Sequence, residues 1–509
     1  MNRTNSNWDK INLLKNSLLL GSTQLLSGFL SALFIWILNH NKLSKELSII
    51  VVFYTINQLC LIFINWTQPL YIRDGLEFYS KNKQLNHLFF PRLFFSLFIA
   101  LLILILCFYF GDYLVCFLKI NRQILNYAII YFIFQIVFWH LHNSFQSIKL
   151  IPEQSYMLIL DKLTPLLLFP ILFHFNLINQ KYILFSIIAG NIIGIFYGFF
   201  KIKKHIITKF NIFNFKNYLF DSIPLIASVI VSFLATGSID HFFIKHYLNE
   251  SQLVNYFIIF QFYGMYLQFP TVISSLILNW LTSLIVEKKT KTIKIFFKKT
   301  TPILSILFLF VSLFVYIIIA IILKMFYQID ENLFQAPLLI LIFSSVISFI
   351  NIIAFSPFIL AKRNIKLSLY LSITNAFLNL VGNYLLIFEF EIIGIAYSTF
   401  ISVFVSINIV TIYIFIKNNI IDFQLFFLYL SLFIGASTAL FFPSFSFLII
   451  TIGFLILIML FIFKIKTIRI VFKNLKQILF YISISHSTLF LSTSNIKEIL
   501  FLYIFIPES

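Results

Sequence analysis

The sequence predicts an all-α polytopic membrane protein with about 14 transmembrane helices. Hydrophobic residues make up 60% of the 509 residues and charged residues only 11%, whereas about a quarter of an ordinary globular protein is charged. Apolar runs of helix length recur along the chain, and about 20 apolar residues are needed to cross roughly 30 Å of hydrocarbon. These runs are continuous, whereas a transmembrane β-barrel would show short alternating segments.

The apolar runs predict the approximate ends of each span. In chain order, the expected spans are Ser17–Leu38, Ile49–Leu70, Leu93–Phe110, Ile124–Phe145, Tyr156–Phe175, Ile183–Phe200, Ile223–Ile244, Leu253–Ile285, Ile303–Leu323, Pro337–Leu360, Leu367–Phe388, Ile392–Ile416, Leu425–Phe442 and Ser446–Phe463. Pro270 is expected to bend the long eighth span, because proline cannot donate a helical hydrogen bond. The apolar pieces after Lys464 are short for a span and are compatible with a position on the membrane surface.

The second and eighth expected spans share a polar pattern with steps of seven and three residues, which keeps the polar groups on one helical face. These groups are Gln58, Asn65 and Gln68, and then Gln261, Gln268 and Thr271. The first and seventh spans also carry polar stripes, which include Gln24 and Asp240 respectively. This repetition predicts two matched halves, the usual construction of secondary transporters.

We therefore predict four parts. Residues 1–205 and 206–420 form two six-helix bundles, residues 421–465 form two appended transmembrane helices, and residues 466–509 form a cytoplasmic or interfacial tail. An even number of spans places both termini on one side of the membrane. The loops on the opposite side hold few of the 37 basic residues, namely Lys42, Lys45, Lys119, Arg122, Lys181, Lys245 and Lys324. Because basic loops stay in the cytoplasm, both termini are expected to be cytoplasmic.

The charge distribution, the cysteines and the motifs argue against several function classes. The net charge of +19 resides in short loops, where it orients a membrane protein, so no nucleic-acid partner is expected. Cys60, Cys107 and Cys116 form no CxxC pair, which argues against a metal site or a disulfide framework. No P-loop, HExxH or GxSxG motif occurs, so the sequence predicts neither an enzyme nor an ATP-driven pump, and no cofactor.

The side-chain amides along these helix faces have two interpretations. Small and amide residues commonly hold membrane helices together, which would make each one a packing residue. Stripes on four equivalent helices instead favour a shared polar cavity, with Gln24, Gln58, Asn65, Gln261 and Gln268 as ligands for a hydrophilic cargo. In the eleventh span the three amides at 375, 379 and 383 follow at steps of four, and they fit a cavity or a helix interface equally well.

Charged groups inside the spans are functional candidates, because each costs roughly 2.5–3.5 kcal/mol near the bilayer centre. Asp161 and Lys162 lie inside the fifth span, but neighbours on a helix point about 100° apart, so no simple ion pair is expected. Lys162 either snorkels to the cytoplasmic surface or attracts a cargo anion. Asp240 either faces the outer interface or, like Asp161, couples transport to an ion.

Two further groups lie toward the cytoplasmic ends of their spans. Arg73 follows the second span and serves either orientation alone or attraction of an anionic cargo. His140 and His142 lie in the fourth span and face different ways on a helix, which disfavours a metal site. A proton-sensitive or phosphate-contacting role remains open for these histidines.

Two stretches carry a family resemblance. The segment GSIDHFFIKHYLNESQLVNYFIIFQFY resembles the segment that opens the second half of polysaccharide exporters, with Asp240 and Tyr256 at its acidic and aromatic positions. The segment YIRDGLEFYSKNKQLNHLFFPRLF is similar to the first cytoplasmic loop of O-antigen flippases. The chain thus resembles the multidrug/oligosaccharidyl-lipid/polysaccharide exporter superfamily, and within it the Wzx-type flippases of O-antigen or capsule repeat units.

The resemblance implies a flippase of the bacterial inner membrane, with membrane lipids and a polyprenyl-pyrophosphate-linked oligosaccharide as partners. It also implies a polysaccharide polymerase and glycosyltransferases as candidate partners. Relatives that flip lipid II carry arginines in the first and eighth spans, where this chain has no charge in the core. The alternative is a cation-coupled multidrug exporter of the same superfamily, which would need acidic residues deep in the first half; Asp161 is the candidate.

Overall fold

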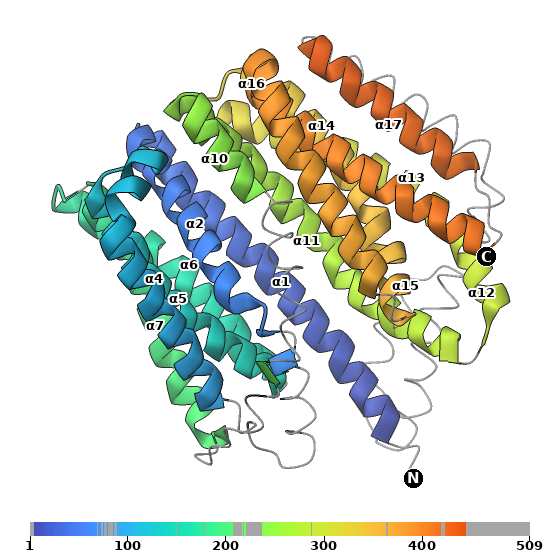
Figure 1. The fold of residues 1–509 in the computed structure, drawn as a ribbon, viewed down its shortest axis with the longest axis horizontal. Helices are drawn as coiled ribbons and strands as arrows, with labels where there is room; N and C mark the ends of the chain where they lie inside the picture. The colour runs from blue at the N-terminus through green and yellow to red at the C-terminus, as the bar shows by residue number, and fades with distance from the viewer. Residues whose placement is uncertain are drawn as a thin grey trace, which may run out of the picture. The chain divides into compact units, whose positions relative to one another are not determined.

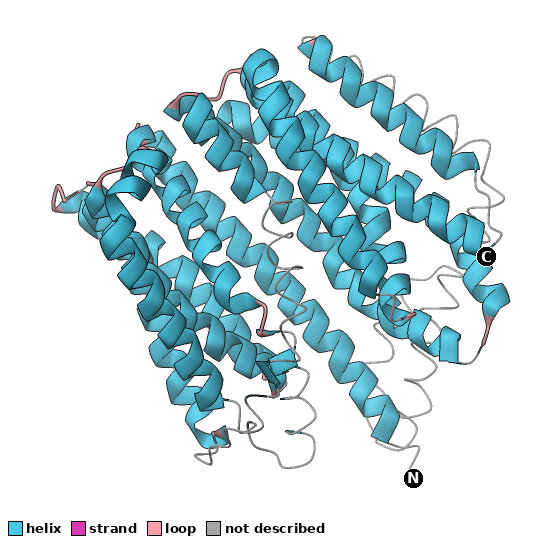
Figure 2. Ribbon diagram, in the orientation of Figure 1, coloured by secondary structure: helices cyan, strands magenta, loops and turns pink. Residues whose placement is uncertain are grey.

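The computed structural model describes most of the chain as helix. The described residues are 5–68, 70–72, 75, 79, 85, 89–148, 150–177, 179–206, 216, 218–219, 237–286, 288–362, 365–418 and 423–443. Residues 16–454 form one compact unit, and the second unit combines residues 1–15 with 455–509. Most of the second unit lies outside the described residues. No strand occurs among the described residues (Figure 2).

The first group of helices runs from blue to green in Figure 1. It consists of α1 (Asn5–His40), α2 (Ser44–Asn65), α4 (Phe89–Leu118), α5 (Arg122–Ser147), α6 (Ile151–His174) and α7 (Gln180–Ile202). Two of the connecting turns end in asparagine caps. The side chains of Asn121 and Asn179 accept hydrogen bonds from the first-turn amides of α5 and α7, which satisfies donors that the helix itself leaves open.

The second group runs from green to orange-red in Figure 1. It consists of α10 (Gly237–Tyr247), α11 (Glu250–Val286), α12 (Thr290–Ile295), α13 (Thr301–Met325), α14 (Glu331–Ile350), α15 (Ser356–Ala361), α16 (Ile365–Asn418) and α17 (Phe423–Phe441). Two π-helical turns, at Phe296–Thr300 and Asn351–Phe355, continue α12 into α13 and α14 into α15. The long α16 is interrupted at Glu391, whose φ of 47° and ψ of −130° are not helical.

The expected polytopic all-α architecture is confirmed. Nine helices in the described part of the chain are long and apolar enough to cross a membrane. The break at Glu391 falls between the eleventh and twelfth expected spans, so α16 contains both of them. The fourteenth expected span, Ser446–Phe463, lies outside the described residues, and the proposed domain bounds remain a prediction.

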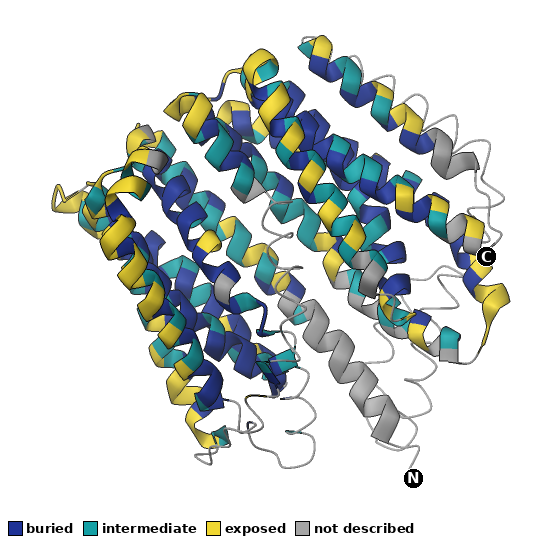
Figure 3. Cartoon of the chain, in the orientation of Figure 1, coloured by how far each residue is buried: buried dark blue, intermediate teal, exposed yellow. Residues whose placement is uncertain are grey.

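Burial differs between helices as a lipid environment requires. In the candidate span that contains α14, 83% of the residues in its apolar 18-residue stretch are buried. In α4 the corresponding share is 28%, and large aromatic side chains such as Phe108 and Tyr113 are exposed. Figure 3 shows the same contrast, with exposed positions along the outer face of α4 and α7. Exposed apolar side chains are unfavourable in water but neutral against lipid tails, so these faces are suited to the bilayer.

Glycines allow α6 and α7 to approach closely. Gly190, Gly194 and Gly198 recur every four residues on one face of α7, the small-residue spacing that brings membrane helices together. A Cβ atom on Gly190 would lie only 2.4 Å from the backbone oxygen of Asp161 in α6. This close approach places the side chains of Asp161 and Asn191 within hydrogen-bonding distance of each other.

Candidate functional site

Asp240 is the centre of a buried polar site in the second group of helices. Its side chain, on α10, is 0% exposed. Oδ1 accepts hydrogen bonds from Nδ2 of Asn379 at 3.2 Å and of Asn383 at 2.8 Å. Oδ2 accepts from the hydroxyls of Tyr256 at 2.9 Å and Thr399 at 3.1 Å. The site therefore draws on α10, α11 and both parts of α16.

The Asp240 carboxylate has hydrogen-bond donors but no basic partner in the described part of the chain, where no ion pair includes it. A buried charge without a counter-charge costs several kcal/mol, so the site favours either protonation of Asp240 or entry of a cation. The side-chain oxygen of Asn383 is also buried and forms no hydrogen bond with the described residues. Carboxylate, amide and hydroxyl oxygens are the ligand types that hard cations prefer.

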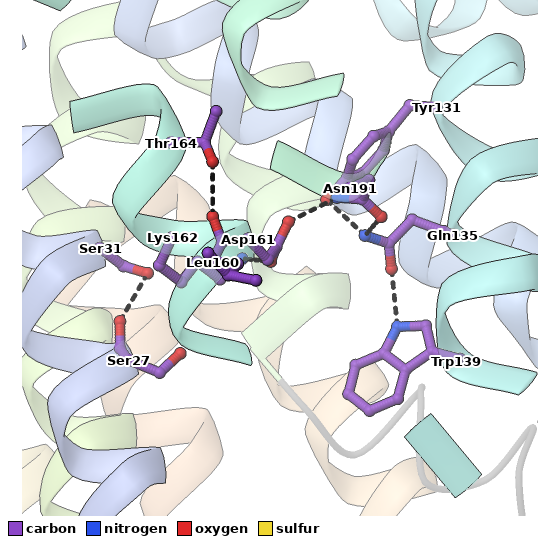
Figure 4. A network of polar contacts seen from close by, with 10 residues as sticks. All are labelled: Ser27, Ser31, Tyr131, Gln135, Trp139, Leu160, Asp161, Lys162, Thr164 and Asn191. Carbon is purple, nitrogen blue, oxygen red and sulfur yellow. Dashed lines mark hydrogen bonds and ion pairs between the residues drawn. The ribbon is translucent and has the colours of Figure 1, made fainter. Parts of the chain in front are cut away.

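The first group of helices contains a second buried carboxylate, Asp161 on α6 (Figure 4). Its Oδ1 accepts a hydrogen bond from Asn191 Nδ2 at 2.6 Å. Asn191 Oδ1 accepts from Gln135 Nε2 at 2.6 Å, and Gln135 Oε1 accepts from the Trp139 indole at 2.6 Å. This chain of bonds links α6, α7 and α5, and it orients the Asp161 carboxylate.

Asp161 and Lys162 form an ion pair, with 2.8 Å between Nζ and Oδ2. The prediction that these neighbours would not pair was therefore wrong. The 100° rule applies to the Cβ directions, whereas the long lysine side chain is able to bend back over its own helix. The Lys162 ammonium also lies 5.8 Å from the centre of the Tyr54 ring of α2, and the Lys162 side chain is 26% exposed.

The two carboxylate sites thus differ in charge. At Asp161 the adjacent lysine supplies a positive charge, whereas at Asp240 only neutral donors approach among the described residues. Sequence reasoning identified both aspartates but missed Asn191 and Thr399. The amides at 379 and 383 were noted, and their spacing of one helical turn places them on one face of the helix, but this spacing does not identify Asp240 as their partner.

The predicted cargo ligands occupy helices that pack together. α2 packs against α11, and Met265 of α11 lies against Gly28 of α1. Gln58 is exposed, while Gln24, Asn65, Gln261 and Gln268 are half-buried. No hydrogen bond joins these five side-chain amides to the described residues, so they do not act there as hydrogen-bonded helix contacts. Their role as cargo ligands remains a prediction, and Arg73 lies outside the described residues.

Hydrogen bonds join the two groups of helices at one end. The Trp36 indole donates to the Phe326 carbonyl at 2.9 Å, and the Asn39 amide donates to the Tyr327 carbonyl at 2.7 Å. Lys119 Nζ donates to the His246 carbonyl at 2.7 Å. These residues lie at or beside the turns that the basic-residue distribution assigns to the outer side.

The fold is similar to those of a solved flippase and a solved multidrug transporter. The lipid II flippase MurJ in its inward closed conformation is 16% identical over 89% of this chain and 100% of that chain, with a TM-score of 0.59. An inward-facing multidrug resistance MATE family transporter of the MOP superfamily is 12% identical over 78% of this chain and 98% of that chain, with a TM-score of 0.54. No protein-family model matches the chain, and no curated protein matches its sequence.

Proposed function

We propose that this protein is a flippase. It would move a polyprenyl-pyrophosphate-linked oligosaccharide from the cytoplasmic to the outer leaflet of the bacterial inner membrane, for surface polysaccharide synthesis. The observation that carries the proposal is a set of side-chain amides that have no hydrogen-bond partner among the described residues. They lie on α2 and α11, which pack together, and on α1, whose Gly28 lies against Met265 of α11. The shared fold with the lipid II flippase MurJ supports a cargo of the same general kind.

The chemistry of such a cargo explains why amides are suitable. A sugar–pyrophosphate head loses its water when it enters hydrocarbon, and each polar group left without a hydrogen bond costs several kcal/mol. An amide offers both donors and an acceptor, so Gln58 and Gln261 can replace water at sugar hydroxyls. The polyprenyl chain needs no such ligand, because it can stay in the lipid beside the protein.

Asp240 is the proposed coupling site. Rotation of the Asn379 and Asn383 amides by about 180° would turn their oxygens toward a cation, and the ion would neutralise the Asp240 carboxylate. Protonation of Asp240 would neutralise the same charge without any rotation. Either event removes the cost of a buried charge, so a gradient of Na⁺ or H⁺ can drive a change in the packing of α10 against α16.

Lys162 is the proposed contact for the pyrophosphate. Its ammonium pairs with Asp161 and retains partial exposure, so a cargo anion would compete with Asp161 for the same charge. A pyrophosphate carries more negative charge than one carboxylate, which favours its association with the lysine. Displacement would leave Asp161 available for a proton or a cation, and this would link cargo binding to ion uptake.

The bonds at the outer end fit one state of an alternating-access cycle. The contacts of Trp36 and Asn39 with the turn at Phe326–Tyr327 would hold the outer side closed while cargo enters from the cytoplasm. They must break before the cargo can leave on the outer side. Since each is a single hydrogen bond, a modest change in ion binding suffices to shift this equilibrium.

Replacement of both Gln58 and Gln261 by leucine tests the proposal. The double variant should lose surface polysaccharide while its level in the membrane stays normal, because leucine cannot replace water at a sugar hydroxyl. Gln123→Leu is the matched control, since Gln123 is exposed at the outer end of α5. Normal polysaccharide in the double variant would refute the assignment of these amides to the cargo.

The alternative is a cation-coupled multidrug exporter, which the likeness to a MATE transporter and the buried Asp161 of the first helix group both favour. It predicts that deletion of the gene sensitises cells to cationic drugs and leaves surface polysaccharide intact. The flippase predicts the reverse pattern, so a single deletion strain scored for both traits separates the two functions.

A further inference from the structure

A buried arginine occupies the end of the first helix group that carries the basic loops. Arg92, on the first turn of α4, is 2% exposed. Buried polar side chains from the residues that follow α2, from α4 and from the last turns of α5 either contact it or neighbour its contacts along the chain. We call this set the Arg92 cluster: Thr67, Tyr71, Arg92, Ser96, His140, Asn143 and Ser144.

Among the described residues, Arg92 contacts only neutral groups. Its Nε donates to the Thr67 hydroxyl at 3.0 Å, its Nη1 contacts Nδ1 of His140 at 3.0 Å, and its guanidinium lies 4.8 Å from the centre of the Tyr71 ring. Within the described part of the chain no carboxylate forms an ion pair with it. Arginine stays protonated in proteins, so Arg92 cannot lose its charge as a buried lysine can.

The uncompensated charge is accompanied by unpaired polar atoms. Ser96 lies one turn beyond Arg92 on α4, and its buried hydroxyl forms no hydrogen bond within the described part of the chain. Asn143 is 0% exposed, and neither its side-chain nitrogen nor its oxygen completes a hydrogen bond with a described residue. Because Arg92 can only donate, His140 must accept at Nδ1 and carry its proton at Nε2, which also completes no hydrogen bond.

The charge and the polar atoms of the Arg92 cluster favour one kind of ligand. The cluster presents a fixed positive charge together with unpaired N–H and O–H donors, and such groups are satisfied by an anion with several oxygens. A guanidinium binds phosphate oxygens through a pair of parallel hydrogen bonds. The N-terminus of α4, which begins at Phe89, lies one turn away and adds a partial positive charge.

We propose that the Arg92 cluster is a binding site for a phosphate-bearing anion. Two sources share this chemistry: the pyrophosphate of an isoprenoid carrier, and the phosphodiester headgroup of an anionic membrane phospholipid. The site is separate from the carboxylate centres of Asp161 and Asp240. It does not depend on the proposed transport function, because binding can be measured on the purified protein alone.

Asn143→Leu and Ser96→Ala separate a ligand site from a packing role. A buried polar group without a partner destabilises a protein, so its removal from a site that binds nothing should leave the thermal stability unchanged or raise it. In a ligand site, the same substitutions remove hydrogen bonds to the anion. Arg92→Gln removes the charge, and Arg122→Gln, at the other end of α5, is the matched control for loss of an arginine.

The experiment measures binding to the purified full-length protein with paired probes. Farnesyl pyrophosphate is compared with farnesol by calorimetry in a neutral detergent. Retention of phosphatidylglycerol is compared with that of phosphatidylcholine by native mass spectrometry. We expect the wild-type protein and Arg122→Gln to prefer at least one phosphate-bearing anion, and Arg92→Gln and Asn143→Leu to weaken that binding by about tenfold or more.

The pattern of preference identifies the source. Binding of farnesyl pyrophosphate alone assigns the isoprenoid carrier, and retention of phosphatidylglycerol alone assigns the membrane lipid; binding of both assigns a general phosphate site. The proposal is overturned if the wild-type protein prefers neither anion, or if Asn143→Leu binds as tightly as the wild type. If Arg92→Gln does not fold, Asn143→Leu and Ser96→Ala decide the outcome.

Discussion

Asn383 donates its side-chain amide to Oδ1 of Asp240 at 2.8 Å, across 143 residues of sequence. The bond joins α16 to α10, and Asn379 reinforces it from one turn earlier on the same helix face. In contrast, the carboxylate of Asp161 is held by the residue that follows it in the chain. The negative charges of the two buried carboxylates are thus balanced in different ways. Substitutions at the two sites should therefore have different effects.

Asp240→Asn should abolish ion-driven transport. Asparagine has nearly the same shape, so the protein should reach normal levels in the membrane, but the buried charge that attracts an ion is gone. We expect transport in vesicles with an imposed Na⁺ or H⁺ gradient to fall at least about tenfold. Glu389→Gln, an exposed position on α16, is the control and should transport normally. Full gradient dependence in Asp240→Asn would exclude Asp240 as the coupling site.

Lys162→Met should destabilise the protein through Asp161. Removal of one partner leaves a buried carboxylate uncompensated, and such losses amount to about 3–5 kcal/mol for fully buried pairs. Because the Lys162 side chain is 26% exposed, we expect the lower part of that range. The measurement is the unfolding temperature of the purified protein in detergent.

The combined variant Asp161→Asn with Lys162→Met completes this test. With the charge removed from both sides, most of the lost stability should return, since no buried charge is left alone. If Lys162→Met and the combined variant unfold at the same temperature, the Asp161 charge does not destabilise the protein when Lys162 is absent, which would contradict this account. Lys162→Met leaves the network through Asn191 and Gln135 intact, and in the combined variant the side-chain oxygen that Asp161→Asn retains can still accept from Asn191.

Gly190→Ala should separate α6 from α7. Its new Cβ would meet the backbone oxygen of Asp161 at 2.4 Å, and a backbone atom cannot move aside as a flexible side chain can. We expect a loss of about 1–3 kcal/mol in stability and a weaker bond between Asp161 and Asn191. Gly264→Ala is the matched control, because its Cβ would have no neighbour within 4 Å. Equal unfolding temperatures for the two variants would contradict the predicted contact.

The sequence predicted the architecture well because the hydrocarbon core imposes a length on each helix. The expected span Ile124–Phe145 and the observed α5, Arg122–Ser147, differ by two residues at each end. The helices extend beyond the apolar runs because capping residues such as Asn121 begin them outside the hydrocarbon. The π-helical turn at Phe296–Thr300 was missed, because hydrophobic periodicity assumes regular α-helical bonding.

The candidate site was predictable only in part. Asp161 and Asp240 were identified as functional candidates only because a charged side chain inside a span costs free energy. Their partners depend on tertiary packing between helices, which spacing within one helix does not specify. The Asp161–Lys162 pair was missed for the opposite reason, since it is local but depends on the flexibility of the lysine side chain. Arg92 gave no sequence signal, because it resembles any other basic residue of a loop end.

The most direct measurement is the location of lipid-linked oligosaccharides in cells that lack this protein. The account predicts that lipid-linked repeat units accumulate in the cytoplasmic leaflet and that surface polysaccharide disappears, with both restored by the wild-type gene. Unchanged surface polysaccharide, with repeat units still reaching the outer leaflet, would contradict it.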